Sequence, residues 1–162
     1  MMFGFFKKNP VKTYTVEVFG KIPFYRDYLS TVQSKEGRQW KDWILSNYGR
    51  RIQVPKKKSR FLFQYKKTAR VVVGIISDSS DGKREFPFSV FVILKRKNVQ
   101  RQCIQLWEQL DVIYQIAINT KEINSFYNDL MSRTIVNDPN KDNLMNEYVF
   151  QQWPSLLILD HN

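Results

Sequence analysis

The side chains that most often carry covalent or acid–base chemistry are scarce in this sequence. Its 162 residues include one cysteine, Cys103, and one histidine, His161. A thiol nucleophile needs an activating base and an accessible, electropositive setting. Cys103 falls on the apolar stripe of a predicted helix, which indicates a buried, inert thiol. His161 is the penultimate residue, where a general base is rarely held in a fixed position, so we expect neither residue to act in catalysis.

Metal and phosphate chemistry also lack their usual motifs. One cysteine and one histidine are fewer ligands than a zinc site normally has. Asp78, Asp81 and Glu85 do not follow calcium-loop spacing, and Lys83 and Arg84 beside them would repel a cation. The six glycines form neither GxGxxG nor GxxxxGK[ST]. We therefore expect no metal, no cofactor and no enzymatic activity.

The chain is strongly basic, with a formal net charge of +11. Residues 1–104 hold 23 Lys and Arg against 7 Asp and Glu, whereas residues 105–162 hold 3 against 8. A basic face favours an acidic partner, which is a nucleic acid, an anionic membrane surface or an acidic protein. Phe61, Phe63 and Tyr65 lie among the basic residues, and single-stranded bases could stack on them unless they pack in the core. Because no recognition motif accompanies the charge, nucleic-acid binding is the alternative interpretation.

Length and apolar content predict one domain over residues 1–162. The sequence is 43% hydrophobic and 15% aromatic, which is enough to build a core. A single cysteine forms no disulfide within the chain. The first residues lack the order of a signal peptide, and no apolar run approaches the roughly 20 residues that span a bilayer. We therefore expect a cytoplasmic protein.

Strand-forming residues dominate the first part of the chain. Residues 13–19 alternate in polarity, which predicts a strand with one buried face. The segments 60–65 and 69–77 predict a hairpin with its turn at 66–68. The apolar run 86–94 predicts a strand that is buried on both faces.

A helix is expected within residues 27–48, because Trp40 and Trp43 belong to an apolar stripe with helical spacing. Asp27 is a candidate for its N-terminal cap, and Gly49 is a natural stop. This helix would follow a loop after the first strand.

Helical patterns dominate the second part of the chain. Residues 99–117 show helical spacing, and a further amphipathic helix follows Thr120, its candidate cap. Residues 137–140 indicate a loop, 142–153 a last helix, and 156–159 either a short strand or a tail docked on the core. The pattern predicts an α/β domain whose sheet is mixed or largely antiparallel and is covered by helices.

One loop segment has a distinctive composition. Residues 20–28 are Gly-Lys-Ile-Pro-Phe-Tyr-Arg-Asp-Tyr, directly after the first predicted strand. Taken alone, they indicate a turn. Their order resembles the opening of the TagF family (also called ImpM) of type VI secretion-associated proteins, which is close to G-K-L/I-P-x-x-G-D-F followed by a helix with W-x-x-W/L. The matching residues are Gly20, Lys21, Ile22, Pro23 and Asp27, with Tyr28 in place of Phe, then Trp40 and Trp43.

A second segment resembles the family's G-R-x-F-P-L pattern, which follows a polar loop and leads into a strand. The polar loop is predicted at 77–82. Arg26 and Lys83 stand at the glycine positions of the two motifs, and the resemblance covers roughly residues 14–131. Two motifs in the expected order are more specific than either alone. The residues that match the second motif are Arg84, Phe86 and Pro87.

The resemblance implies a single TagF-like domain built as a three-layer α/β/α sandwich, without enzymatic activity. Such proteins are cytoplasmic accessory factors, and the best-known members restrain the secretion machine by engaging a scaffold protein with a forkhead-associated domain. We therefore predict a regulatory protein that binds this scaffold or another secretion component. The predicted partner-binding residues are Lys21, Pro23, Arg26, Asp27, Lys83, Arg84, Phe86 and Pro87.

We expect the two motif segments to lie at the same edge of the sheet. A purely structural role is the alternative interpretation. In that case Phe86 and Pro87 seat a strand, and Asp27 pairs with Arg84 to join the two loops.

Overall fold

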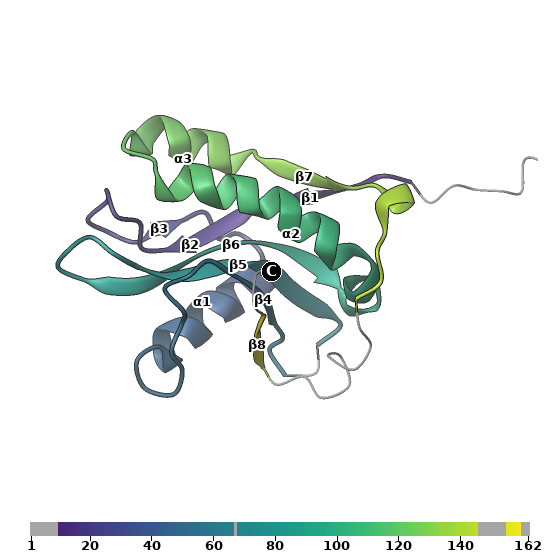
Figure 1. Ribbon diagram of the computed structural model, residues 1–162, viewed down its shortest axis with the longest axis horizontal. Helices are drawn as coiled ribbons and strands as arrows, with labels where there is room; N and C mark the ends of the chain where they lie inside the picture. The colour runs from purple at the N-terminus through teal and green to yellow at the C-terminus, as the bar shows by residue number, and fades with distance from the viewer. Residues whose placement is uncertain (1–9, 67, 146–154, 160–162) are drawn as a thin grey trace, which may run out of the picture.

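A computed structural model describes residues 10–66, 68–145 and 155–159, which adopt a mixed α/β fold (Figure 1). The main sheet has six strands in the order β3-β2-β6-β5-β4-β8, and β1 and β7 form a separate two-stranded sheet. The strands are β1 (Lys12–Thr15), β2 (Glu17–Gly20), β3 (Leu29–Ser30), β4 (Ser59–Phe63), β5 (Arg70–Ser80), β6 (Glu85–Lys95), β7 (Thr134–Asn137) and β8 (Leu156–Leu159). The helices are α1 (Lys35–Asn47), α2 (Arg96–Ile118) and α3 (Ile123–Met131), with a short 3₁₀ helix at Pro139–Lys141.

Each pairing between these strands is antiparallel. The sequence predicts a mixed or largely antiparallel sheet; the described strands confirm the antiparallel pairing and include no parallel pair. The reason is local: residues 81–84 alone join β5 to β6, and a connection this short permits only antiparallel pairing. None of the described helices has the length and apolarity that crossing a bilayer requires.

Strands β5 and β6 form the centre of the sheet and are 11 residues long each. Their alternate side chains face α2 on one side and α1 on the other, so both faces are buried, as the sequence predicts for residues 86–94. The polar loop expected at 77–82 is shorter in the structure. Residues 77–80 continue β5 and pair with residues 85–88, because the turn is confined to residues 81–84.

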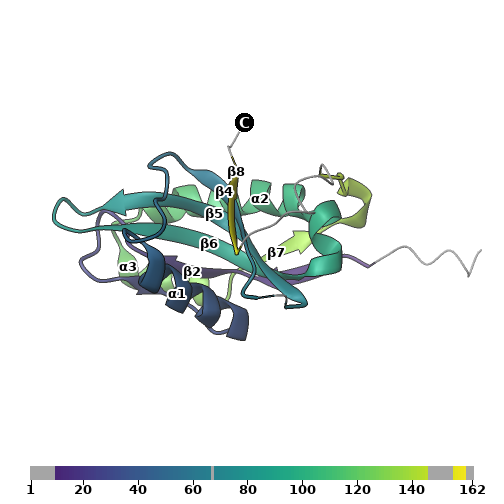
Figure 2. The same cartoon turned by 90° about the horizontal axis from the view of Figure 1, so that it is seen from below.

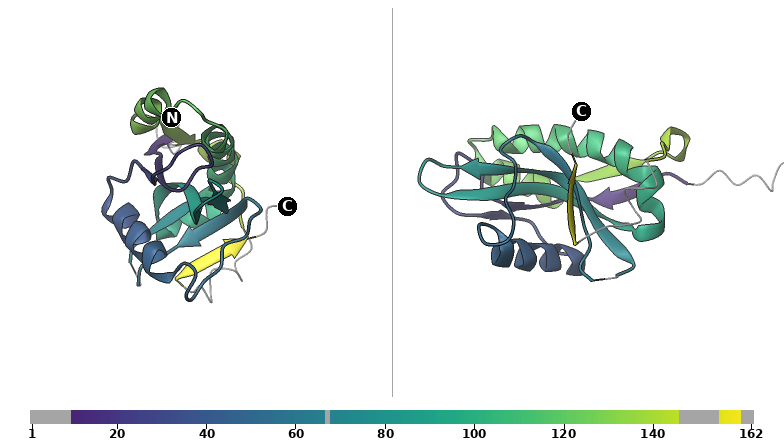
Figure 3. Two further views of the ribbon diagram at one scale, coloured as in Figure 1. Left: turned by 90° about the vertical axis from the view of Figure 1, so that its left-hand side faces the viewer. Right: turned by 60° about the horizontal axis from the view of Figure 1, so that its bottom comes forward.

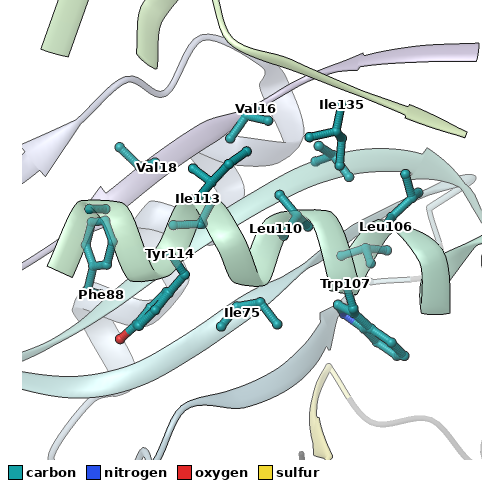
Figure 4. Packing of buried hydrophobic residues seen from close by; sticks show 14 of the residues in the cluster. Val16, Val18, Ile75, Phe88, Leu106, Trp107, Leu110, Ile113, Tyr114 and Ile135 are labelled. Carbon is teal, nitrogen blue, oxygen red and sulfur yellow. The ribbon is translucent and has the colours of Figure 1, made fainter. Parts of the chain in front are cut away.

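Helix α2 covers one face of the sheet. Leu106, Trp107, Leu110, Ile113 and Tyr114 point from the helix toward the strands (Figure 4). This arrangement confirms the helix that the apolar spacing predicts. The sheet residues in the same cluster include Val71, Val73, Ile75, Phe88 and Val90.

Helix α1 lies on the opposite side of the sheet from α2 and α3 (Figures 1 and 2). Trp40 and Ile44 are buried there against Phe61 and Phe63. The rings of Trp40 and Phe61 stack with centroids 4.7 Å apart. The indole Nε1 of Trp40 donates a 2.9 Å hydrogen bond to the hydroxyl of Ser89, so the buried indole is satisfied.

Helix α1 begins later than expected because its start depends on a distant residue. Glu17 is buried, and its carboxylate accepts hydrogen bonds from the backbone N–H groups of Gln33 and Ser34 and from the Ser34 hydroxyl. Ser34 in turn caps the helix by accepting from the N–H of Gly37. Asp27 therefore caps no helix, and that expectation is wrong.

The first predicted strand is divided at Val16. Residues 12–15 pair with β7, whereas residues 17–20 join the main sheet. The N–H of Val16 donates to the carbonyl of Arg133, which holds the chain where it passes between the two sheets. The expectation of one strand with one buried face misses this change of partner.

Three expectations for the second part have different outcomes. Thr120 caps no helix, since α3 begins at Ile123 after Glu122. Asp142–Met145 are not helical, and residues 146–153 of the expected last helix lie outside the described residues. Leu156–Leu159 is a strand that pairs with β4 at the edge of the main sheet (Figure 3).

Candidate functional site

The two motif segments meet at one end of the main sheet. Gly20, the last residue of β2, lies opposite Phe88 of β6, and the N–H of Lys21 donates to the carbonyl of Pro87 at 3.2 Å. Gly20 has φ +135°, and a Cβ there would lie 1.9 Å from the Pro87 carbonyl oxygen. Only glycine fits this approach of the two backbones. The expectation that the segments share an edge of the sheet is confirmed.

A buried lysine joins the two loops. The side chain of Lys21 is fully buried, and its Nζ lies 2.9 Å from Oδ2 of Asp81 in the β5–β6 turn. The same ammonium donates to the carbonyls of Tyr25 and Arg26. A lysine ammonium has three donors, so its three acceptors satisfy the buried charge.

Asp81 is held as a carboxylate by this arrangement. Its side chain accepts from Lys21 and from the backbone N–H groups of Lys83 and Arg84. These hydrogen bonds, first of all the one from Lys21, hold the pKa of Asp81 well below its usual range. The loops are therefore joined by Lys21 and Asp81, and the ion pair expected between Asp27 and Arg84 does not form.

Three of the eight predicted partner-binding residues are buried. Lys21 and Pro87 belong to the contacts just described, and Phe86 packs against the rings of Tyr28 and Tyr48. Their burial contradicts the expectation that they contact a partner directly, and it indicates that these three residues support the loops. Pro23 is half-buried, whereas Arg26, Asp27, Lys83 and Arg84 are exposed.

Two exposed aromatic residues complete this end of the molecule. Phe24 is 52% exposed, and the ammonium of Lys121 lies 5.1 Å from the centre of its ring. Tyr28 is 42% exposed and stacks on buried Phe86 with centroids 4.7 Å apart. The sequence alone did not single out Phe24. It occupies one of the positions that the first motif leaves open to any residue, and it belongs to no run in which apolar and polar residues alternate. We call the exposed set the loop surface: Phe24, Arg26, Asp27, Tyr28, Lys83 and Arg84.

The residues beneath the loop surface form satisfied contacts. The hydroxyl of Tyr48 donates a 2.7 Å hydrogen bond to Asp78, and burial together with this bond raises the pKa of Tyr48. Ser89 accepts from Trp40 and donates to the carbonyl of Phe19 at 3.0 Å. These groups stabilise the loops, and none of them is a free base beside a nucleophile.

The remaining chemical candidates form no site among the described residues. Cys103 is buried, and burial raises the pKa of its thiol to about 12. His161 lies outside the described residues. The part of the chain that the structure describes holds no group of three His, Cys, Asp or Glu residues that could bind a metal ion.

A cluster of positive charge lies away from the loop surface. It gathers around the start of α2, at the opposite end of the β5–β6 hairpin from the 81–84 turn (Figure 1). Phe61 and Phe63, two of the three aromatics among the basic residues, are buried and cannot stack on bases, whereas Tyr65 is 37% exposed. We call this region the basic end; its residues are Lys12, Arg70, Lys95, Arg96, Lys97 and Arg101.

The structure therefore defines a mixed α/β protein with two joined loops at one end of an antiparallel sheet and a basic end opposite. No family model matches the sequence, and a search of the curated proteins finds no matching relative.

Proposed function

We propose that this protein is a non-catalytic, cytoplasmic accessory factor of a type VI secretion system that regulates the system by binding another protein through the loop surface. The observation that carries the proposal is the ion pair between Lys21 and Asp81. It makes one structural unit of the two segments that resemble the TagF motifs. The proposal includes a single domain with three layers, in which α1 and the α2–α3 pair enclose the main sheet.

The composition of the loop surface supports a protein partner. Aromatic and arginine side chains are enriched where proteins bind one another, and Phe24, Tyr28, Arg26 and Arg84 are exposed together here. The stacking of Tyr28 on Phe86 and the contacts of Lys21 fix the loop before binding. A loop that is already ordered loses less conformational entropy when a partner binds.

The charge of the loop surface indicates what kind of protein surface fits it. Arg26, Lys83 and Arg84 outnumber the single carboxylate of Asp27. Such a surface is complementary to an acidic patch with an apolar centre. We propose that the partner is the forkhead-associated scaffold protein of the secretion system.

Binding to the purified scaffold protein tests this function. We expect the wild-type protein to bind, and Phe24→Ala and Arg84→Glu to weaken binding at least about tenfold, as loss of an interface anchor does. Arg50→Glu is the matched control, because Arg50 is exposed and lies outside the loop surface. If the scaffold is not bound, and no other secretion component is recovered from the native cell, the proposal is wrong.

Nucleic-acid binding remains the alternative because of the basic end. It predicts an affinity that falls steeply with salt, since released counterions drive binding to phosphates. Fluorescence anisotropy with single- and double-stranded probes at low salt separates the two functions. A flat titration would remove the alternative.

A further inference from the structure

The basic end contains a pocket of about 380 Å³ that the function proposed above does not use. It opens between the start of α2, the start of β1 and the end of β7, on the right-hand side of Figure 1. We call it the basic pocket. Its lining residues are Pro10, Lys12, Lys97, Asn98, Arg101, Gln102, Asn137, Pro139 and Asp142.

One residue that lines this pocket carries a buried acceptor with no partner among the described residues. Asn137 ends β7 and is only 1% exposed, yet its Oδ1 accepts no hydrogen bond. The neighbouring polar groups are satisfied by one another: Gln105 donates to Asp142 and to the carbonyl of Asp138, and accepts from the Asp138 N–H. Because a buried acceptor without a donor is unfavourable, Asn137 indicates a ligand that donates a hydrogen bond.

The cations of the pocket indicate the rest of that ligand. Lys12, Lys97 and Arg101 form no ion pair with a described residue, and the one carboxylate in the lining is Asp142. Three cations and one carboxylate leave a net charge of +2, which matches a dianion. The guanidinium of Arg101 is held by Asn98 through a 3.1 Å hydrogen bond, so one cationic group is fixed in place.

The start of α2 adds to the attraction. The helix has 23 residues, no capping side-chain hydrogen bond and no acidic residue in its first turn. The N-terminus of such a helix carries a partial positive charge, and Lys97 and Asn98 of this turn line the pocket. No acidic side chain in the first turn neutralises this partial charge.

We propose that the basic pocket binds a small phosphate monoester that carries a free hydroxyl group near its phosphate, such as a sugar phosphate. The phosphate dianion contacts Lys12, Lys97 and Arg101, and the hydroxyl donates to Oδ1 of Asn137. A planar or aliphatic anion without a hydroxyl would leave Asn137 unsatisfied. The site is separate from the loop surface, so it stands or falls independently of the partner proposed above.

Isothermal titration calorimetry at low salt with ribose 5-phosphate and with ethyl phosphate, a phosphate monoester without a hydroxyl group, tests the proposal. We expect ribose 5-phosphate to bind about tenfold more tightly, which is the effect of one satisfied buried hydrogen bond. Lys97→Glu should weaken both ligands at least about tenfold. Asn137→Ala should weaken ribose 5-phosphate alone and so remove the preference for the hydroxyl.

Two further variants keep the test decisive. Arg101→Gln changes an exposed residue, so it tests the phosphate contact even if Asn137→Ala fails to fold. Lys56→Glu changes an equally exposed lysine outside the pocket and should leave both affinities unchanged.

Three results would overturn the proposal. The first is that neither ligand binds, or that both bind the wild type equally. The second is that Lys56→Glu weakens binding as much as Lys97→Glu does, which would indicate unspecific attraction of anions. The third is that a single-stranded oligonucleotide displaces ribose 5-phosphate and binds far more tightly, which would assign the basic end to nucleic-acid binding.

Discussion

The ammonium of Lys21 and the carboxylate of Asp81 lie 2.9 Å apart at the end of the sheet, although 60 positions separate them in the chain. Lys21 is fully buried, and Asp81 is partly exposed. The pair joins the loop after β2 to the turn between β5 and β6. Its contribution to stability leads to the first two predictions.

Lys21→Met removes the cation that pairs with Asp81 and should lower the free energy of unfolding by about 2 kcal/mol, within the range for leaving a buried polar group without its partner. The change also leaves the carbonyls of Tyr25 and Arg26 without their donor. Urea denaturation followed by tryptophan fluorescence measures the loss. Arg26→Ala is the control, because its side chain is exposed and only its backbone carbonyl takes part. Equal stability of Lys21→Met and wild type would contradict the role of the pair.

The stability of the protein should depend on pH through Asp81. Its pKa is lower in the folded protein than in the unfolded chain, where it is about 4. The ionised carboxylate therefore contributes stability that is fully present above the unfolded pKa. It is lost as the pH falls from about 5 toward the folded pKa. The Asp81→Asn variant should lack this component, so its unfolding free energy should fall less steeply than that of the wild type over that range. Parallel curves would show that another carboxylate dominates.

Gly20→Ala should be far more destabilising than Gly49→Ala. Both glycines have positive φ, but a Cβ at Gly20 would lie 1.9 Å from the backbone oxygen of Pro87, whereas Gly49 has open space. The cost at Gly49 should be about 1 kcal/mol, the strain of the left-handed conformation alone. At Gly20 the two strands must also separate, so we expect loss of the folded state or a melting temperature lower by about 10 °C or more. Thermal unfolding followed by circular dichroism measures both variants, and similar melting temperatures would contradict the close approach.

Cys103 should not react with a thiol reagent while the protein is folded. Burial raises the pKa of its thiol to about 12, so almost no thiolate is present near neutral pH. Labelling with Ellman's reagent should proceed only after denaturant is added. Rapid labelling of the folded protein would show that Cys103 is accessible and would reopen a nucleophilic role.

The local pattern of the sequence predicted much of the fold. The alternation before and after residues 66–68 indicated the β4–β5 hairpin, the apolar run 86–94 indicated β6, and the helical spacing around Leu106 indicated α2. These elements follow from periodicity, because side chains repeat every two residues on a strand and about every 3.6 on a helix. The order of the two motifs also predicted that their loops meet.

Long-range contacts decided the remainder. The sequence pattern around residues 13–19 continues through Val16, but the chain changes sheets there because β7 offers a second partner. The start of α1 depends on Glu17, and Asp27, a good capping residue by type, is left in the loop. None of these outcomes is encoded in neighbouring residues alone.

The candidate site shows the same division. By itself the sequence determined which residues belong to the two loops, since glycine, proline and the acidic turn residues set the backbone there. Only the tertiary structure decided which of them face solvent. Lys21, Phe86 and Pro87 are buried because β2 and β6 pair directly beside them, whereas Phe24 and Tyr28 are left exposed at the end of the sheet. Burial depends on what the rest of the chain packs against a residue, and residue type alone does not specify it.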